Sequence, residues 1–158
     1  MNLVKRLLLC LVPCALYLAS CTTIDLYEKS VAIPGHAWKS SNKPTFTFTI
    51  KDTASPYQLF FILRHKDRYN YNNIYINLQV RLPGSDSVRV IRRDLTLATD
   101  AEGWVDASGM DDIFEHRIRL GEPEMLKAGN YTFTIEHIMR EDPLQHVLNV
   151  GLRVEKKQ

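Results

Sequence analysis

From residue 45 onward, apolar and polar residues alternate along most of the chain. The stretch Thr45–Ile50 places Phe46, Phe48 and Ile50 on one face and threonines on the other. Successive side chains of a β-strand point to opposite faces, so this pattern predicts a strand with one buried and one solvated face. The same alternation predicts three further strands, at residues 74–80, 131–135 and 148–154.

Other apolar stretches are less regular. Gln58–His65 contains five consecutive apolar residues and predicts a central strand that is buried on both faces. Val88–Leu97 and Ile113–Leu120 predict two more strands. One helical turn is expected at Pro123–Ala128, because a proline stands near its start and Gly129 follows its end.

About eight strands at hairpin spacing, with almost no helix, predict an all-β protein. We expect an antiparallel β-sandwich with a jelly-roll-like arrangement, and an immunoglobulin-like sandwich is the alternative. The sandwich is expected to cover residues 44–158. Residues 21–43 contain loop signals such as Pro34–Gly35 and are expected to form a lead-in, part of which a sheet can still recruit.

The first twenty residues have the layout of a secretory signal peptide. Lys5 and Arg6 precede an apolar run, Leu7–Leu18, which is shorter than the ~20 residues that a transmembrane helix needs. The run ends in Leu18-Ala19-Ser20-Cys21, which resembles the lipobox of bacterial lipoproteins. We therefore expect a signal peptide at residues 1–20 and a lipid on the thiol of Cys21.

Cleavage before Cys21 changes the chemistry that is available to the chain. Cys10 and Cys14 leave with the signal peptide, and the lipid occupies the remaining thiol, so cysteine catalysis, disulfides and thiolate metal sites are excluded. Loss of Lys5 and Arg6 leaves 18 basic and 18 acidic residues. A balanced charge of this kind gives no long-range attraction for nucleic acid.

No motif for catalysis or cofactor binding stands out. The sequence contains no G-x-S-x-G, P-loop or H-E-x-x-H pattern, so we expect a non-enzyme without cofactors. The histidines lack metal-ligand spacing, and His116 and His137 are expected to be hydrogen-bonded residues within strands. Asp111-Asp112 with Glu115 lacks the pattern of a dedicated calcium loop and is expected to be a solvated acidic loop.

Candidate contact residues come from a polar connection and from isolated aromatic residues. The connection Arg64–Asn73 carries two tyrosines, and loops on a rigid scaffold are common binding elements. Tyrosine, tryptophan and arginine are also the residue types that anchor partners, although each can instead pack a core edge. The candidates for contact with a partner or a glycan are Trp38, Arg64, Tyr69, Tyr71, Trp104 and Arg140.

The chain as a whole resembles the gliding-motility-associated lipoprotein H family, which occurs in gliding Bacteroidetes and in non-motile relatives. The segments that carry the resemblance are the lipobox, Ile33–Trp38, Leu63–Ile74, Asp100–Trp104, Gly129–Arg140, Leu144 and Val150–Lys156. The resemblance implies an accessory lipoprotein of the gliding apparatus, which is linked to the type IX secretion system. It implies no catalytic residue.

This resemblance gives a working hypothesis and an alternative. The hypothesis is a lipid-anchored, non-catalytic accessory or scaffold subunit that binds other envelope proteins. The alternative is a carbohydrate-binding envelope lipoprotein. Thr22-Thr23 after Cys21 lacks an acidic surface-export cluster, so we expect attachment to the outer membrane facing the periplasm.

Overall fold

The computed structural model describes residues 26–157, so the predicted signal peptide and Cys21 lie outside the described residues. Within this range no helix is long and apolar enough to span a membrane. The strands are β1 (Leu26–Ala32), β2 (Ala37–Trp38), β3 (Thr45–Ile50), β4 (Pro56–Lys66), β5 (Asn73–Arg81), β6 (Val88–Thr96), β7 (Ala98–Thr99), β8 (Gly103–Trp104), β9 (Ala107–Met110), β10 (Ile113–Arg119), β11 (Glu124–Met125), β12 (Gly129–His137), β13 (Leu144–Gln145) and β14 (Val147–Lys156). A single 3₁₀ turn, η2 (Pro34–His36), interrupts the strands of the described part.

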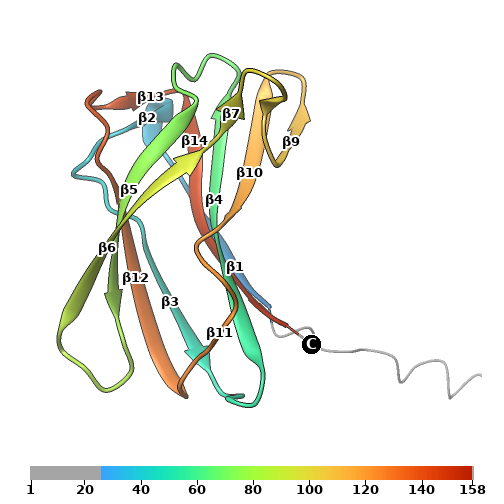
Figure 1. Cartoon of the computed structure of the whole chain (residues 1–158). Helices are drawn as coiled ribbons and strands as arrows, with labels where there is room; N and C mark the ends of the chain where they lie inside the picture. The colour runs from blue at the N-terminus through green and yellow to red at the C-terminus, as the bar shows by residue number, and fades with distance from the viewer. Residues whose placement is uncertain (1–25, 158) are drawn as a thin grey trace, which may run out of the picture.

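Two antiparallel sheets pack face to face, as Figure 1 shows. The first sheet has the order β1-β14-β4-β10-β9, with β11 beside the start of β4. The second has the order β3-β12-β5-β6. The predicted antiparallel β-sandwich is therefore confirmed.

The pairing of the eight long strands identifies the type of sandwich. β1 pairs with β14, β3 with β12, β4 with β10, and β5 with β6. The first of the eight strands along the chain thus pairs with the last, and the fourth, β5, pairs with the fifth, β6. The chain is therefore one long hairpin that is rolled into two sheets. This is the jelly-roll arrangement. In the immunoglobulin-like alternative the first strand would pair with the second.

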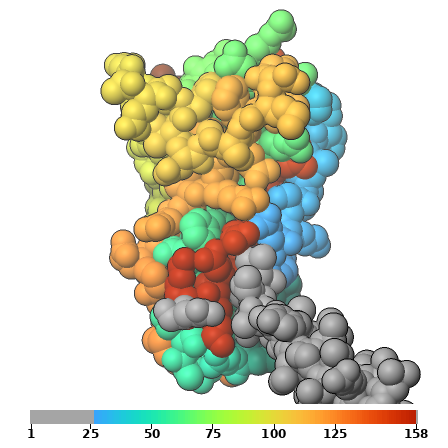
Figure 2. All heavy atoms as spheres, turned by 90° about the vertical axis from the view of Figure 1, so that its right-hand side faces the viewer, coloured from blue at the N-terminus to red at the C-terminus, as the bar shows by residue number. Residues whose placement is uncertain are grey.

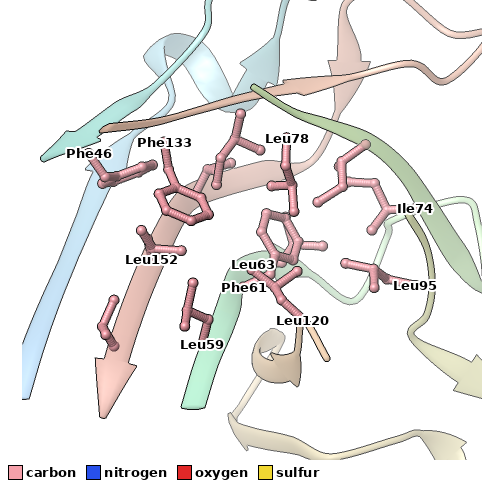
Figure 3. Close-up of a cluster of buried hydrophobic side chains, with 14 of the residues drawn as sticks. Phe46, Leu59, Phe61, Leu63, Ile74, Leu78, Leu95, Leu120, Phe133 and Leu152 are labelled. Atoms are coloured by element: carbon pink, nitrogen blue, oxygen red, sulfur yellow. The ribbon is translucent and has the colours of Figure 1, made fainter. Parts of the chain in front are cut away.

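Side chains from both sheets fill the space between them. Figure 3 shows Phe46 and Phe133 of the second sheet beside Phe61, Leu63 and Leu152 of the first. All of these except Phe133, which is 7% exposed, are completely buried. Each side chain of this kind contributes about 1.5–3 kcal/mol when it leaves water, and the alternation of the sequence is what directs them inward.

The structure corrects two of the sequence predictions. Part of the lead-in belongs to the sandwich, because β1 pairs with β14 along seven residues and Tyr27 and Val31 pack against the core. Within the described residues the domain therefore begins at Leu26 instead of residue 44. The helical turn predicted at Pro123–Ala128 is wrong, because β11 satisfies its backbone by pairing with the first residues of β4.

The outer faces of the two sheets differ in chemistry. On the first sheet Glu28 lies between Arg117 and Arg153, which are on different strands, and contacts both. On the second sheet threonines of β3 and β12 face each other, and the hydroxyls of Thr45 and Thr134 are 2.9 Å apart. One face is thus covered by paired charges and the other largely by uncharged hydroxyl and amide groups.

The sandwich has two distinct ends. We call one the Leu26 end: β1 begins and β14 ends there, and it carries the connections 51–55, 82–87 and 120–128. We call the other the loop end; it carries the connections 33–44, 67–72, 97–112 and 138–146. In Figure 2 the yellow-to-orange spheres of residues 97–112 lie at the top, at the loop end.

Gly151 permits the close approach of β1 to β14. A Cβ atom at this position would stand 2.8 Å from the carbonyl oxygen of Lys29 and 3.2 Å from the Cβ of Ile62. We expect Gly151→Ala to lower the free energy of unfolding by about 1–2 kcal/mol, because β1 has to shift away from its partner. Chemical denaturation measures this change. Asn149→Ala, on the same strand, should stay within about 0.5 kcal/mol of the wild type, and equal stability of the two variants would contradict the argument.

Candidate functional site

All six predicted contact residues lie at the loop end. Trp38 is in β2, Arg64 stands two residues before the end of β4, and Trp104 is in β8. Tyr69 and Tyr71 are in the connection 67–72, and Arg140 follows β12 in the connection 138–146. The fold thus gathers residues that are more than 100 positions apart at one end of the sandwich.

Two of the six are core residues, so the prediction of an exposed contact is wrong for them. Trp38 is completely buried and donates its Nε1–H to the carbonyl oxygen of Asn42 at 2.7 Å. Tyr69 is 4% exposed and donates its hydroxyl to the carbonyl oxygen of Asn73 at 3.1 Å. In both cases the ring packs inside while the polar atom reaches a backbone acceptor, as is usual for buried tyrosine and tryptophan.

Tyr69 belongs to an aromatic cluster with two histidines at its centre. The His65 ring lies 5.0 Å from the ring of Tyr69, 4.5 Å from that of Trp104 and 6.0 Å from that of Phe114. His116, on the neighbouring strand β10, stacks on His65 at 5.0 Å. Both histidines are completely buried. The cluster therefore fixes the end of β4, the start of β10 and the connection 67–72 to one another.

The two histidines share a hydrogen-bonding problem. Their Nε2 atoms are 2.9 Å apart, while Nδ1 of His65 lies 2.7 Å from the oxygen of Lys66 and Nδ1 of His116 lies 2.8 Å from the oxygen of Val105. A carbonyl oxygen only accepts, so the three contacts together need three ring protons. Two neutral rings carry two. One contact in the neutral pair therefore has no proton.

Burial nevertheless favours the neutral rings. It lowers the pKa of His65 to about 4, although the hydrogen bond to Lys66 acts in the opposite direction. Burial also lowers the pKa of His116. The expectation of a hydrogen-bonded histidine holds for His116. It does not hold for the buried His137, whose Nε2 is 3.8 Å from a carboxylate oxygen of Asp142. His65 is the residue that sequence reasoning overlooked. Its position inside the apolar run of β4 was the available signal, because that run was already expected to be buried on both faces.

The remaining candidates reach the surface of the loop end. Arg64 and Arg140 are exposed, and Tyr71 and Trp104 are half-buried. The Tyr71 phenol donates a hydrogen bond to the carboxylate of Glu141, and this bond raises the pKa of Tyr71. Tyr71 and Arg140 are thus neighbours through Glu141, whereas Arg64 faces the other side of the loop end beside Glu115.

Trp104 borders an acidic surface. Its Nε1–H donates to a carboxylate oxygen of Asp67 at 3.3 Å. The connection 97–112 around it contains five acidic residues and no lysine or arginine. Met110 in the same connection is 81% exposed. The exposed part of the loop end therefore combines a half-buried tryptophan, an exposed methionine and a run of carboxylates.

The carboxylates of this connection were expected to form a solvated acidic loop. Asp111 and Asp112 are exposed, and Glu115 is half-buried beside Arg117 on β10. Between residues 26 and 157 there is no group of three or more histidine, cysteine, aspartate or glutamate side chains placed to hold a metal ion.

Comparison with known proteins gives one family. The family model described as "GldH lipoprotein" matches residues 25–154. The gliding motility lipoprotein GldH of Flavobacterium johnsoniae is 27% identical over 150 residues, which are 90% of this chain and 92% of that protein. A gliding motility lipoprotein GldH homolog of Christiangramia forsetii is 23% identical over 147 residues, covering 87% and 88% of the two chains.

Similar solved structures are more distant. A carbohydrate-binding module specific for non-crystalline cellulose, CBM28, has a TM-score of 0.41 at 11% identity over 81% of this chain and 70% of its own. The VP2 subviral particle of infectious bursal disease virus has a TM-score of 0.35 at 15% identity over 84% and 32% of the two chains.

The buried histidine pair predicts how stability depends on pH. The pKa of His65 in the folded chain, about 4, is below the ~6.5 of an unfolded histidine. Between these two pH values His65 is protonated in the unfolded chain and neutral in the folded chain. The free energy of unfolding therefore falls as the pH falls from about 6.5 to about 4, by up to about 1.4 kcal/mol per pH unit. Denaturation at a series of pH values measures this slope.

Two variants isolate the contribution of His65 to this slope. His65→Phe should lose less stability across the window, whatever its absolute stability, because one of the three buried histidines with a lowered pKa is then missing, while His116 and His137 remain. Replacement of the exposed His36 by alanine should leave the slope as it is. An unchanged slope in His65→Phe would show that the pair is not the source of the pH dependence.

Proposed function

The chain belongs to the GldH lipoprotein family, and from this we propose that it is a non-catalytic accessory or scaffold subunit of the gliding-motility apparatus and the linked type IX secretion system. Its relatives are named as gliding motility lipoproteins and match it over most of their length. No catalytic residue comes with the family resemblance. The proposed role is therefore to bind other envelope proteins at a defined distance from a membrane.

The proposed anchor is a lipid on Cys21. The Leu-Ala-Ser-Cys sequence supports this assignment, and two or three acyl chains hold a protein firmly on a bilayer. We further propose that the protein is attached to the outer membrane and faces the periplasm, because Thr22-Thr23 after Cys21 is not an acidic export cluster. The sandwich starts five positions later, at Leu26.

The observation that carries the proposal is the separation of the two ends of the sandwich. The chain enters the fold at the Leu26 end, whereas Arg64, Tyr71, Trp104 and Arg140 reach the surface at the loop end. β4 runs from one end to the other in 11 residues, which corresponds to about 35 Å. A short tether at one end thus presents the loop end to partners away from the bilayer.

The glycan-binding alternative loses its main support. It depended on exposed aromatic rings that stack on sugars, but Trp38 and Tyr69 are buried and Trp104 is packed against His65 and Phe114. The surface of the loop end consists mainly of charged groups, together with the half-buried Tyr71 and Trp104 and the exposed Met110. This mixture suits a protein partner better than a sugar ring.

The anchor and the loop end can be tested separately in the native cell. Cys21→Ala should move the protein from the membrane fraction to the soluble fraction, and it should impair secretion or surface assembly. The double variant Arg64→Glu, Arg140→Glu should stay in the membrane fraction and still lower secretion at least several-fold, because it reverses the charge of the exposed partner contacts. Fractionation and quantification of secreted cargo measure the two effects.

A matched charge reversal controls for nonspecific effects. Lys29 on β1 and Lys51 at the Leu26 end are exposed and lie away from the loop end. The double variant Lys29→Glu, Lys51→Glu should secrete normally. Normal secretion and surface assembly in a strain that lacks the gene altogether would remove the proposed function.

A further inference from the structure

A cavity of about 480 Å³ opens between the two sheets at the Leu26 end. It lies between the turn that joins β5 to β6 and the connection that joins β10 to β12. Inward-facing apolar side chains line it from both sheets, among them Leu59, Leu78, Val80, Ile91, Leu120 and Phe133. Its size falls in the range of about 300–1,000 Å³ that is typical of small-molecule sites. At this place the hydrophobic core is open to the outside.

Polar side chains hold the cavity open by fixing the segment beside it. Gln58 is buried and donates its amide to the carbonyl oxygen of Gly121 at 2.7 Å. Arg93 on β6 donates its Nε–H to the carbonyl oxygen of Leu120 at 3.3 Å. These two bonds tie residues 120–121 to both sheets, so the cavity is built into the fold and is not a gap beside a loose loop.

Exposed apolar side chains gather around the same end. Five large hydrophobic residues are exposed in the described part of the chain, and four of them are Leu82, Val88, Val90 and Met125, at 47–59% exposure. Leu82 and Met125 also line the cavity. The fifth, Met110, is at the loop end. Val88 and Val90 are at the start of β6 and face the outer side of the second sheet, so the exposed apolar rim of the cavity consists of Leu82 and Met125. Exposed apolar side chains beside an apolar cavity mark an interaction surface.

The position of the predicted anchor indicates what this surface meets. Leu26 lies opposite Glu155 of β14, and the next strands are β4 and then β11 with Met125. Strands are about 4.8 Å apart, so β11 is only about 14 Å from β1 along the sheet. Five peptide units separate Cys21 from Leu26 and reach at most about 18 Å. A lipid on Cys21 therefore keeps this end of the sandwich next to the bilayer.

The charges around the cavity have no strong sign. Arg89 and Lys127 stand on its rim together with Glu122 and Glu124, and all four are exposed. The attraction of the basic residues to anionic headgroups is therefore largely cancelled by the repulsion of the acidic ones, and the burial of apolar side chains has to supply the binding free energy. The balanced charge distinguishes this surface from a basic patch, which binds anionic lipids by electrostatic attraction.

We propose that the Leu26 end is a membrane-contact surface, in which Leu82 and Met125 enter the bilayer interface and the cavity accepts one acyl chain of a bilayer phospholipid. The orientation rests on the proposed acylation of Cys21, whereas the affinity of the surface for lipid belongs to the folded domain itself. The contact fixes the orientation of the sandwich relative to the bilayer, so that the loop end points away from the membrane.

The acylated full-length protein, reconstituted in vesicles of phosphatidylethanolamine and phosphatidylglycerol, tests the contact. Met125→Cys and Met110→Cys each place one free thiol on an exposed methionine position, at opposite ends of the sandwich, for a polarity-sensitive fluorophore. The label at position 125 should show blue-shifted emission and at least twofold quenching by lipids brominated near the headgroup. The label at position 110 should behave as in water. The proposal is overturned if the protein cofractionates with the vesicles but the emission of the label at position 125 is that of a label in water. In that case the lipid anchor is still functional.

The domain without its lipid tests the affinity. The Cys21→Ser form of the processed chain, shown to be folded by its thermal transition, should bind the same vesicles, and Leu82→Asp with Met125→Asp should weaken this binding at least tenfold. Met110→Asp is the matched control and should change it less than twofold. Binding should persist when phosphatidylglycerol is omitted. No binding by the Cys21→Ser form, or equal losses in both variants, would overturn the proposal.

Filling the cavity tests the acyl-chain site itself. Ile91→Trp points a large ring into the cavity, whereas Gln79→Trp places the same ring on the outer face of β5. Native mass spectrometry of the Cys21→Ser form after exposure to vesicles should find one bound phospholipid per chain in the wild type and in Gln79→Trp, and none in folded Ile91→Trp. Blue-shifted emission at position 125 that appears only with envelope protein extract, and not with vesicles, would assign the surface to a protein partner and refute the lipid assignment.

Discussion

The pairing of the first strand with the last is the constraint on which the rest of the structure depends. β14 lies between β1 and β4, so the final strand of the described chain is an interior strand of the first sheet. Its ladder to β4 also positions His65, since Val147 pairs with that residue. The loop end, the Leu26 end and the core between them all take their geometry from this late strand. At Gly151 the backbone of β1 approaches β14 closely.

The two ends of the sandwich then divide the molecule by chemistry. The loop end is polar and acidic at its surface and rigid beneath it, because the rings around His65 and His116 pack its connections together. The Leu26 end is where the core opens and apolar side chains stand exposed. For a protein of the GldH lipoprotein family, this difference between the ends is consistent with the proposed membrane contact at the Leu26 end and the proposed partner contact at the loop end.

Much of the fold was predictable because the alternation of the sequence reports burial on one face of a sheet. Strand order was not, since every strand of an antiparallel sandwich carries the same pattern. Local exceptions also escaped prediction. A β-bulge in β14 leaves Val147 buried and Leu148 only half-buried. The extra residue of a bulge shifts the alternation of buried and exposed positions by one, and the amino-acid composition does not reveal it. Trp38 and Tyr69 were misjudged because loop position suggests exposure, whereas tertiary packing decides it. The cavity arises from the spacing of two sheets, which no single segment encodes.

The position of β14 between two strands that precede it in the chain has a consequence for how the first sheet is completed. β14 follows β1 and β4 in the chain, so a chain that emerges from its N-terminus onward presents β14 only after the two strands that pair with it. Until then neither β1 nor β4 has its main partner, and long-range strand pairing is slow in any case. The first sheet is therefore completed only after β14 has emerged. A chain truncated before Val147 leaves the edges of β1 and β4 that normally pair with β14 unpaired.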